Sequence, residues 1–318
     1  PTSSRRQRQM CIRDRKKVSI DGSNLKSYCE LDISGSKSES NRILILKSIF
    51  NNIKINNLSS SDDTSVLNHS LQNLNENIDV GHAGTSMRFL TAYLATLENK
   101  KFIISGSDRM HQRPIGLLVD ALNSLGFKVN YLKKRGFPPL EIIGSKNLHH
   151  EVVLKSHISS QFVSALTLIA PSLDNGLRII LQDDITSKPY INMTISILNK
   201  IGVDATFEKN LINVKPTKKI NDIIYDVESD WSSVSYFFSM VALTKNLKLS
   251  ISNYKKESFQ GDVNVCKYYE TYGVKTVFEG NRLIITKDEN KNLPKKIEID
   301  LNDNPDLAQT VIAVSYTH

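Results

Sequence analysis

The sequence predicts an α/β fold that is assembled from repeated units. Small or hydroxyl-bearing residues introduce an apolar helix pattern at Gly84, Ser159, Ser232 and Pro305. Successive starts are 75, 73 and 73 residues apart, a regular spacing that is typical of internal duplication. A further helix start at Ser36 precedes them at a shorter interval.

A second series of residues repeats in step with the first. Helix patterns end at Gly126, Gly202 and Gly273, which are 76 and 71 residues apart, and glycine is the usual residue just beyond a helix. Alternating strand patterns follow these glycines, as in residues 274–278. Each repeat therefore contains two helices and several strands. Because this period is longer than that of common solenoids, we expect compact βα units that are packed into domains.

Composition and cysteine content favour a cytoplasmic protein of about two domains. The chain has 318 residues, and 40% of them are hydrophobic, which is ordinary for a soluble globular protein. The sequence contains neither an apolar run long enough for a membrane helix nor the apolar segment of a secretory signal. Cys11, Cys29 and Cys266 are odd in number and widely separated, so we expect reduced thiols and no metal site.

The net charge of +8 is concentrated at the N-terminus. Residues 1–17 carry a net charge of +6 and lack any apolar periodicity, whereas the rest of the chain is nearly neutral at +2. We therefore expect a disordered tail rather than a surface that binds nucleic acid. This tail and the ending Ser315–His318 resemble translated sequencing-adapter read-through, and we expect both to be foreign to the natural protein.

The segment Ser34–Arg42 is the most informative of the helix starts. It is small, hydroxyl-rich and basic, and it runs into the apolar pattern Ile43–Leu46. Unpaired backbone N–H groups and the helix dipole attract anions at such an end, and Lys37 and Arg42 add positive charge. The alternative interpretation is a serine-capped surface helix with solvated charges.

The other helix starts, and the loops between them, carry further polar groups. Guanidinium groups clamp phosphate or carboxylate through paired donors, whereas serine and glutamine side chains bind neutral oxygens. Asp306 is a lone carboxylate among these groups and suits a general base. For each residue the alternative is an ordinary helix cap or surface charge. The candidate residues are Lys37, Ser38, Arg42, Arg88, Arg113, Ser159, Ser160, Gln161, Ser187, Tyr190 and Asp306.

Together, these motifs occur in an order and spacing that resembles one enzyme family, the 3-phosphoshikimate 1-carboxyvinyltransferases or EPSP synthases. The resemblance covers residues from about 18 to about 314. It rests on seven segments in the same order: Ser34–Arg42, Ala83–Arg88, Arg109–Ile115, Ser159–Phe162, Ser187–Tyr190, Glu228–Tyr236 and Asn304–Asp306.

The resemblance implies the two-domain enolpyruvyl transferase fold, an inside-out α/β barrel type built from repeated βαβαββ units. Residues 18–35 and 228–318 would form the C-terminal-type domain, and residues 36–227 would form the N-terminal-type domain that binds shikimate 3-phosphate. The family's last repeat, with its later Lys, Glu and Arg motifs, would lie beyond residue 318. We therefore expect the given chain to be a fragment that lacks the last of six repeats and is inactive or nearly so.

The implied reaction transfers the enolpyruvyl group of phosphoenolpyruvate to the 5-hydroxyl of shikimate 3-phosphate and releases phosphate. Asp306 would take the hydroxyl proton, and Lys37 would assist proton transfer and stabilise the leaving phosphate. Gly84 would leave room for phosphoenolpyruvate, which Lys37, Arg88 and Arg113 would face. The residues implied to bind shikimate 3-phosphate are Ser38, Arg42, Ser159, Ser160, Gln161, Ser187 and Tyr190.

The resemblance implies no metal or organic cofactor, and we expect a monomer that binds small molecules and neither nucleic acid nor a membrane. His82 and Phe89 depart from the residues that the family usually has at these positions. Two alternatives stay open: the related transferase that acts on UDP-N-acetylglucosamine, and an inactive fragment that only binds shikimate 3-phosphate. Ser159–Gln161 and Ser187–Tyr190 favour the shikimate substrate over the nucleotide sugar.

Overall fold

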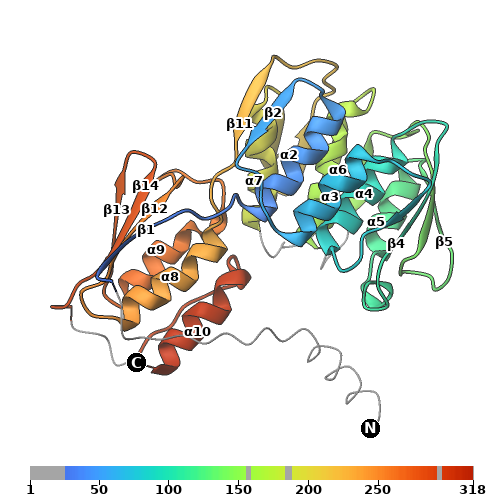
Figure 1. Ribbon diagram of the computed structural model, residues 1–318. Coiled ribbons are helices and arrows are strands. Elements are labelled where there is room, and N and C mark those ends of the chain that lie inside the picture. Colours follow the sequence, from blue (N-terminus) through green and yellow to red (C-terminus); the bar gives the residue numbers. More distant parts are fainter. Residues whose placement is uncertain (1–25, 155–158, 183–187, 292–295, 318) are drawn as a thin grey trace, which may run out of the picture.

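The chain forms two lobes, each with an apolar core of its own (Figure 1). The computed structural model describes residues 26–154, 159–182, 188–291 and 296–317. Lobe 1 comprises the described part of residues 36–227, and its core extends from Ile43 to Val227. Lobe 2 comprises residues 26–35 and the described part of 228–317, and its core extends from Trp231 to Val314. The predicted tail at 1–17 lies outside the described residues.

Three four-stranded sheets share one pattern of pairing. In each sheet the first strand runs parallel to the second, and the second is followed by two antiparallel neighbours. In pairing order, the strands are β3 (Asn77–Asp79), β4 (Lys101–Ser105), β6 (Leu140–Ile143) and β5 (Lys128–Tyr131); β7 (Glu151–Leu154), β8 (Leu177–Leu181), β10 (Leu211–Val214) and β9 (Ala205–Glu208); and β1 (Tyr28–Leu31), β12 (Lys248–Ser252), β14 (Arg282–Lys287) and β13 (Val274–Glu279).

The predicted βαβαββ repeat is confirmed by the order of elements along the chain. Helices α4 (Gly84–Ala95) and α5 (Gly116–Ser124) belong to the first of these sheets, and α6 (Ser160–Ile169) and α7 (Lys188–Lys200) belong to the second. The residues predicted to end the second helix of each repeat are also confirmed. Their backbone φ angles are positive, the conformation that favours glycine: Gly126 at 96°, Gly202 at 93° and Gly273 at 78°.

In each lobe, one unit is completed by a strand from a distant part of the chain. In lobe 1, α2 (Lys37–Ile49), β2 (Ile53–Asn56) and α3 (Asp62–Gln72) are joined by β11 (Ile223–Asp226), which runs parallel to β2. In lobe 2, β1 runs parallel to β12. Along the chain, β12 lies between α8 (Trp231–Leu243) and α9 (Val265–Glu270), so β1 comes from a distant part of the chain. The chain therefore crosses between the lobes twice.

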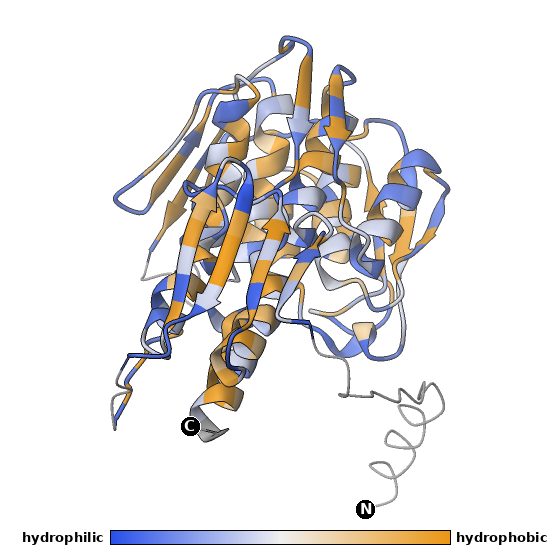
Figure 2. Ribbon diagram, turned by 60° about the vertical axis from the view of Figure 1, so that its left-hand side comes forward, coloured by the Kyte–Doolittle hydropathy of each residue, from blue (hydrophilic) through white to orange (hydrophobic). Residues whose placement is uncertain are grey.

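In lobe 1 the first helix of each unit is largely buried, with sheets on the outside. In lobe 1, α2, α4 and α6 pack against one another, and every residue of α4 is buried. Strands β6, β7 and β8 alternate buried and more exposed residues, which is the pattern of a sheet with one face on the core, and Figure 2 shows apolar and polar colour interspersed along the strands. In lobe 2, α8 packs against α10 (Ala308–Thr317). Short helical turns complete the fold: η2 (Met110–Gln112), η3 (Ala170–Ser172), η4 (Gly261–Asn264) and η5 (Pro305–Leu307).

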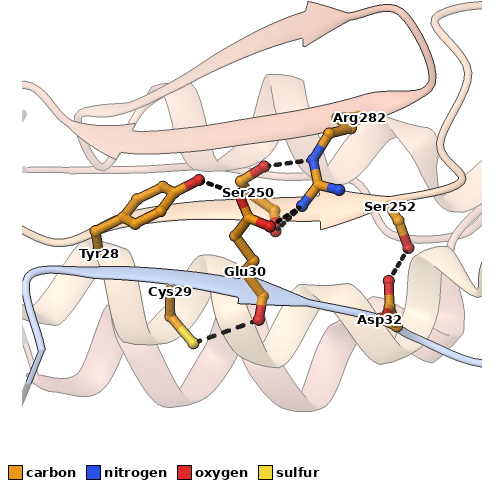
Figure 3. A network of polar contacts seen from close by, with 7 residues as sticks. All are labelled: Tyr28, Cys29, Glu30, Asp32, Ser250, Ser252 and Arg282. Carbon is orange, nitrogen blue, oxygen red and sulfur yellow. Dashed lines mark hydrogen bonds and ion pairs between the residues drawn. The ribbon is translucent and has the colours of Figure 1, made fainter.

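Polar side chains fasten β1 to the sheet of lobe 2 (Figure 3). Arg282 on β14 lies 3.4 Å from the Glu30 carboxylate on β1, and its Nε donates to Ser250 Oγ on β12 at 2.7 Å. The Tyr28 hydroxyl donates to Glu30 at 2.6 Å. These contacts join three strands, so the short N-terminal strand is held by side chains as well as by its backbone ladder.

The two crossings lie side by side. Gly35 bridges to Ser229, and the Ser36 amide donates to the Glu228 carbonyl at 2.8 Å. A Cβ on Gly35 would lie 1.9 Å from the Asn57 carbonyl oxygen, so only glycine fits this contact. We propose these crossings as the boundaries between the two predicted domains.

A carboxylate side chain reinforces the crossings from inside lobe 1. Glu39 accepts hydrogen bonds from the Tyr225 hydroxyl at 2.6 Å and from the Glu228 amide at 3.2 Å. Burial raises the pKa of the Glu39 carboxyl above its ordinary value, and the Tyr225 hydrogen bond opposes that shift. Glu39 therefore ties the first turn of α2 to the segment that returns to lobe 2.

Gly35→Ala should destabilise the protein by about 2 kcal/mol, because the added methyl group collides with the Asn57 carbonyl and the Val227 side chain beside the crossing. Urea unfolding followed by circular dichroism would measure this loss. Substitution of the exposed neighbour Ser34 by alanine serves as the control. An unchanged midpoint for Gly35→Ala would show that the crossing is not tightly packed.

Candidate active site

A cleft of about 410 Å³ lies where three helical starts meet. The first turns of α2 and α8 and the short turn η5 before α10 form its walls, together with the loop that precedes α3. The cleft therefore combines groups from both lobes. Its lining residues are Ser34, Gly35, Lys37, Ser38, Ser59, Ser60, Ser61, Asp230, Ser232, Ser233, Tyr236, Asp306 and Gln309.

The start of α2 is fixed by its apolar residues and by two caps. Residues 43–46 are buried in the core of lobe 1, so the polar turn before them reaches the surface. Ser36 Oγ accepts from the Glu39 amide at 3.4 Å, and Asp230 of lobe 2 accepts from the Lys37 amide at 3.3 Å. These caps occupy two of the helix amides predicted to attract an anion. The positive charge that remains for a ligand is the exposed side chain of Lys37.

Arg42 lies beneath the cleft and not in its lining. It is 2% exposed, and its guanidinium donates to Thr194 Oγ1 at 2.8 Å and to Ser164 Oγ at 3.0 Å. Burial lowers the pKa of Arg42 to about 10. The guanidinium also lies 5.5 Å from the ring centroid of Phe89, one of the two residues that depart from the family pattern. Arg42 therefore joins α2, α4, α6 and α7 around one buried charge.

A second group of cations surrounds the start of α4. Arg88 donates to the Gly84 carbonyl at 2.9 Å and to the Pro114 carbonyl at 3.0 Å, and its Nε is buried without a partner among the described residues. The Arg113 guanidinium covers Gly84 so closely that a Cβ there would lie 2.2 Å from Nη1. Gly84 thus has a steric role in this structure, which is to admit the Arg113 side chain.

The electrostatics of the two arginines favour an anion. Burial and, secondly, the charge of Arg113 lower the pKa of Arg88 to about 10, and Asp63 opposes this shift. Asp63 is also the cap of α4, because its carboxylate accepts from the Ser86 amide at 3.2 Å. A phosphate or carboxylate beside the guanidinium groups would relieve their repulsion and supply the acceptor that Arg88 Nε lacks.

The starts of α6 and α7 bring the remaining candidates. Ser159 caps α6 by accepting from the Gln161 amide at 3.3 Å, and Ser160 and Gln161 are half-buried beside it. Ser187 lies outside the described residues. Ser159, Ser160 and Gln161 do not belong to the described lining of the cleft. Tyr190 on α7 lines a smaller adjoining cavity, which it shares with Ser38.

Tyr190 and Asp306 meet across the two lobes. The Tyr190 hydroxyl on α7 donates to Asp306 Oδ2 on η5 at 2.6 Å. Burial raises the pKa of Tyr190, and the nearby Asp262 and Asp306 carboxylates raise it further, so the hydroxyl keeps its proton. Asp306 itself is exposed to the cleft. A carboxylate in this position can accept a proton from a bound hydroxyl group.

Several residues of the cleft were not identified as site residues from the sequence. Ser59, Ser60 and Ser61 form a hydroxyl-rich run directly before α3, and Asp230 lies inside a recognised segment without an assigned role. The serine run repeats the pattern of the other helix starts, so the same criterion would have found it. The contact of Asp230 with α2 had no such signal, because it joins residues 193 positions apart.

His82, the other departure from the family pattern, is exposed just before α4. Its Nδ1 lies 2.8 Å from Ser107 Oγ. Across the described part of the chain, no cluster of three His, Cys, Asp or Glu side chains is arranged to hold a metal ion. Within the same residues, no helix is long and apolar enough to cross a membrane.

Comparisons with known proteins agree with these features. Residues 75–317 match the family EPSP synthase (3-phosphoshikimate 1-carboxyvinyltransferase). A 3-phosphoshikimate 1-carboxyvinyltransferase of Bacteroides fragilis (strain YCH46) is 37% identical over 283 residues, which cover 89% of this chain and 68% of that protein. The enzyme of the same name from Pseudoalteromonas translucida is 33% identical over 309 residues, covering 88% of this chain and 71% of that protein.

The fold is shared as well. EPSP synthase from Acinetobacter baumannii superposes with a TM-score of 0.69 over 90% of this chain and 69% of that structure, at 18% sequence identity. The predicted enolpyruvyl transferase fold is thereby confirmed. The sequence match and the identities above 30% establish the relationship itself: the chain belongs to the EPSP synthase family, the 3-phosphoshikimate 1-carboxyvinyltransferases.

Proposed function

We propose that the cleft between the two lobes, with the arginine cluster at α4, is the site at which this chain carries out its family's reaction. That reaction transfers the enolpyruvyl group of phosphoenolpyruvate to shikimate 3-phosphate. The observation that carries the proposal is the pair of guanidinium groups of Arg88 and Arg113: the charge of Arg113 adds to the strain on buried Arg88, whose Nε has no acceptor among the described residues. An anionic substrate supplies such acceptors.

The two substrates divide the site between them. Lys37, Arg88 and Arg113 bind phosphoenolpyruvate, whose phosphate and carboxylate require positive charge. Shikimate 3-phosphate lies toward lobe 1. Arg42 holds α6 and α7 together beside it through hydrogen bonds to Ser164 and Thr194. The other residues assigned to shikimate 3-phosphate are Ser38, Ser159, Ser160, Gln161, Ser187 and Tyr190.

Asp306 and Lys37 perform the chemistry in this proposal. Asp306 takes the proton of the 5-hydroxyl while the hydroxyl oxygen bonds to C2 of phosphoenolpyruvate and C3 gains a proton. The tetrahedral intermediate then loses phosphate from C2 and the added proton from C3, which restores the double bond. Lys37 donates to the departing phosphate and stabilises its charge. Both side chains belong to the lining of the same cleft, which supports their pairing.

The alternatives differ in what they bind and release. Transfer to UDP-N-acetylglucosamine is not favoured, because the relatives carry the name of the shikimate enzyme. The inactivity of the chain as given, its monomeric state and its cytoplasmic location stay predictions. Calorimetric titration with shikimate 3-phosphate should give saturable binding. Phosphate release on addition of phosphoenolpyruvate would mark transfer, whereas binding without release would identify a fragment that only binds; absence of binding would contradict the assigned site.

Gly84→Ala should weaken binding of phosphoenolpyruvate about tenfold, because the methyl group displaces the Arg113 guanidinium and loses one charged hydrogen bond. The measurement is titration of phosphoenolpyruvate into the complex with shikimate 3-phosphate. Gly84→Ala combined with Arg113→Gln should bind no worse than Arg113→Gln alone, since both changes act through the same guanidinium. Additive losses in the double variant would contradict this. Arg178→Gln, which removes an exposed ion pair with Glu151, is the charge control.

Tyr190→Phe should lower the affinity for shikimate 3-phosphate about fivefold, because Asp306 loses the hydrogen bond that orients its carboxylate across the lobes. Calorimetry at constant pH measures the change. Tyr93→Phe removes a hydroxyl that donates to the Ser48 carbonyl away from the cleft, and it should leave the affinity unchanged. Equal affinities for Tyr190→Phe and the unmodified chain would argue against the assigned role of this contact.

A further inference from the structure

A buried carboxylate lies directly behind the cleft and has no assigned role. Asp262, on η4 of lobe 2, is 6% exposed. Its Oδ2 accepts from Ser232 Oγ at 2.5 Å, and its Oδ1 accepts from the Asn304 side-chain amide at 3.1 Å. None of the ion pairs among the described residues includes Asp262. Burying a charged group that only neutral donors stabilise costs free energy, so the presence of a carboxylate at this position needs an explanation.

The first partner, Asn304, is completely buried, and both polar atoms of its side chain are hydrogen-bonded. Its Oδ1 accepts from Asn264 at 3.0 Å and from the Tyr268 hydroxyl at 2.9 Å, while its Nδ2 donates to Asp262. The Asn304 carbonyl accepts from the Leu307 amide at 3.1 Å, which closes the turn that contains Asp306. The orientation of the Asn304 side chain therefore fixes the backbone two residues before Asp306.

The second partner, Ser232, stands on the first turn of α8 and belongs to the lining of the cleft. Asp262 thus joins two walls of the cleft, which approach it from different helices. Burial raises the pKa of Asp262 to about 6. The hydrogen bonds from Ser232 and Asn304 oppose this shift, and the charges of Asp306 and Asp230 add to it. At pH 7.5 the carboxylate is ionised, so both oxygens are acceptors, as its two donors require.

We propose that Asp262 is a positioning residue of the transfer reaction: it holds Ser232 and the turn 304–307 in fixed places, so that the Asp306 carboxylate meets Tyr190 and the substrate hydroxyl. Asp262 does not touch the substrate and acts through Asn304. The proposal rests on the function assigned to Asp306 above. It explains why a carboxylate, rather than a neutral residue, occupies this buried place: only a carboxylate accepts from both donors with separate oxygens.

The test exchanges the two side chains. Asp262→Asn leaves one oxygen for two donors and turns an amide toward the Asn304 amide. Asn304→Asp alone places two carboxylates against each other. In the double exchange, the new amide at position 262 accepts from Ser232 and donates to the new carboxylate at position 304, whose second oxygen accepts from Asn264 and Tyr268. Every hydrogen bond of the network is then restored, although the charge has moved from one side chain to the other.

Two measurements follow the turn and the site separately. Hydrogen exchange of the Leu307 amide should accelerate about tenfold in Asp262→Asn, and shikimate 3-phosphate should bind about tenfold more weakly. The double exchange should return both values to within about threefold of the unmodified chain. Asp204→Asn, which removes an exposed ion pair with Lys215 in lobe 1, controls for the loss of a carboxylate.

Each outcome decides the proposal. Unchanged exchange and affinity in Asp262→Asn would overturn it, and so would losses that the double exchange does not restore. If Asp262→Asn does not fold, a double exchange that folds and binds normally supports the proposal, whereas failure of both overturns it. Absence of binding by the unmodified chain counts against the proposed function, while the exchange rate of Leu307 still decides whether Asp262 holds the turn.

Discussion

The structure depends on the place where the chain crosses twice between its lobes. Gly35 and Ser229 lie against each other there, and the Ser36 amide bonds to the Glu228 carbonyl at 2.8 Å. Each crossing leads directly into a helix start, α2 on one side and α8 on the other. The two starts are therefore neighbours, and the cleft forms at their junction. A side chain at Gly35 would displace this crossing, because the Asn57 carbonyl fills the space of a Cβ.

The positive end of a helix attracts anions, yet in this molecule carboxylates already occupy two of these ends. Asp230 accepts from the first amide of α2, and Asp63 caps α4. The affinity for anions must then come from side chains whose charge is not neutralised. Arg88 is the clearest case, because its burial and, secondly, the charge of Arg113 disfavour its charged form, and its Nε lacks an acceptor among the described residues. Such an arrangement is poorly stable by itself and is improved by a bound phosphate or carboxylate.

Acidic groups gather in and beside the cleft, on the side that lobe 2 contributes. Asp230, Asp262 and Asp306 all belong to lobe 2, whereas the buried arginines belong to lobe 1. In the proposed function, lobe 1 supplies the groups that hold anions and lobe 2 supplies the carboxylate that accepts a proton. The hydrogen bond from Tyr190 to Asp306 joins the two lobes at the carboxylate proposed as the base.

The sequence by itself determined the repeated α/β plan, the positions of the helix starts and the family, because these depend on local residue patterns and their spacing. It also selected Lys37 and Asp306, which lie on one cleft. Only the tertiary structure decided that β1 and β11 complete distant units, that Gly84 makes room for Arg113, and that Asp262 supports the turn of Asp306. These contacts join residues far apart in the chain. No local pattern encodes them, because they arise from the packing of whole units against one another.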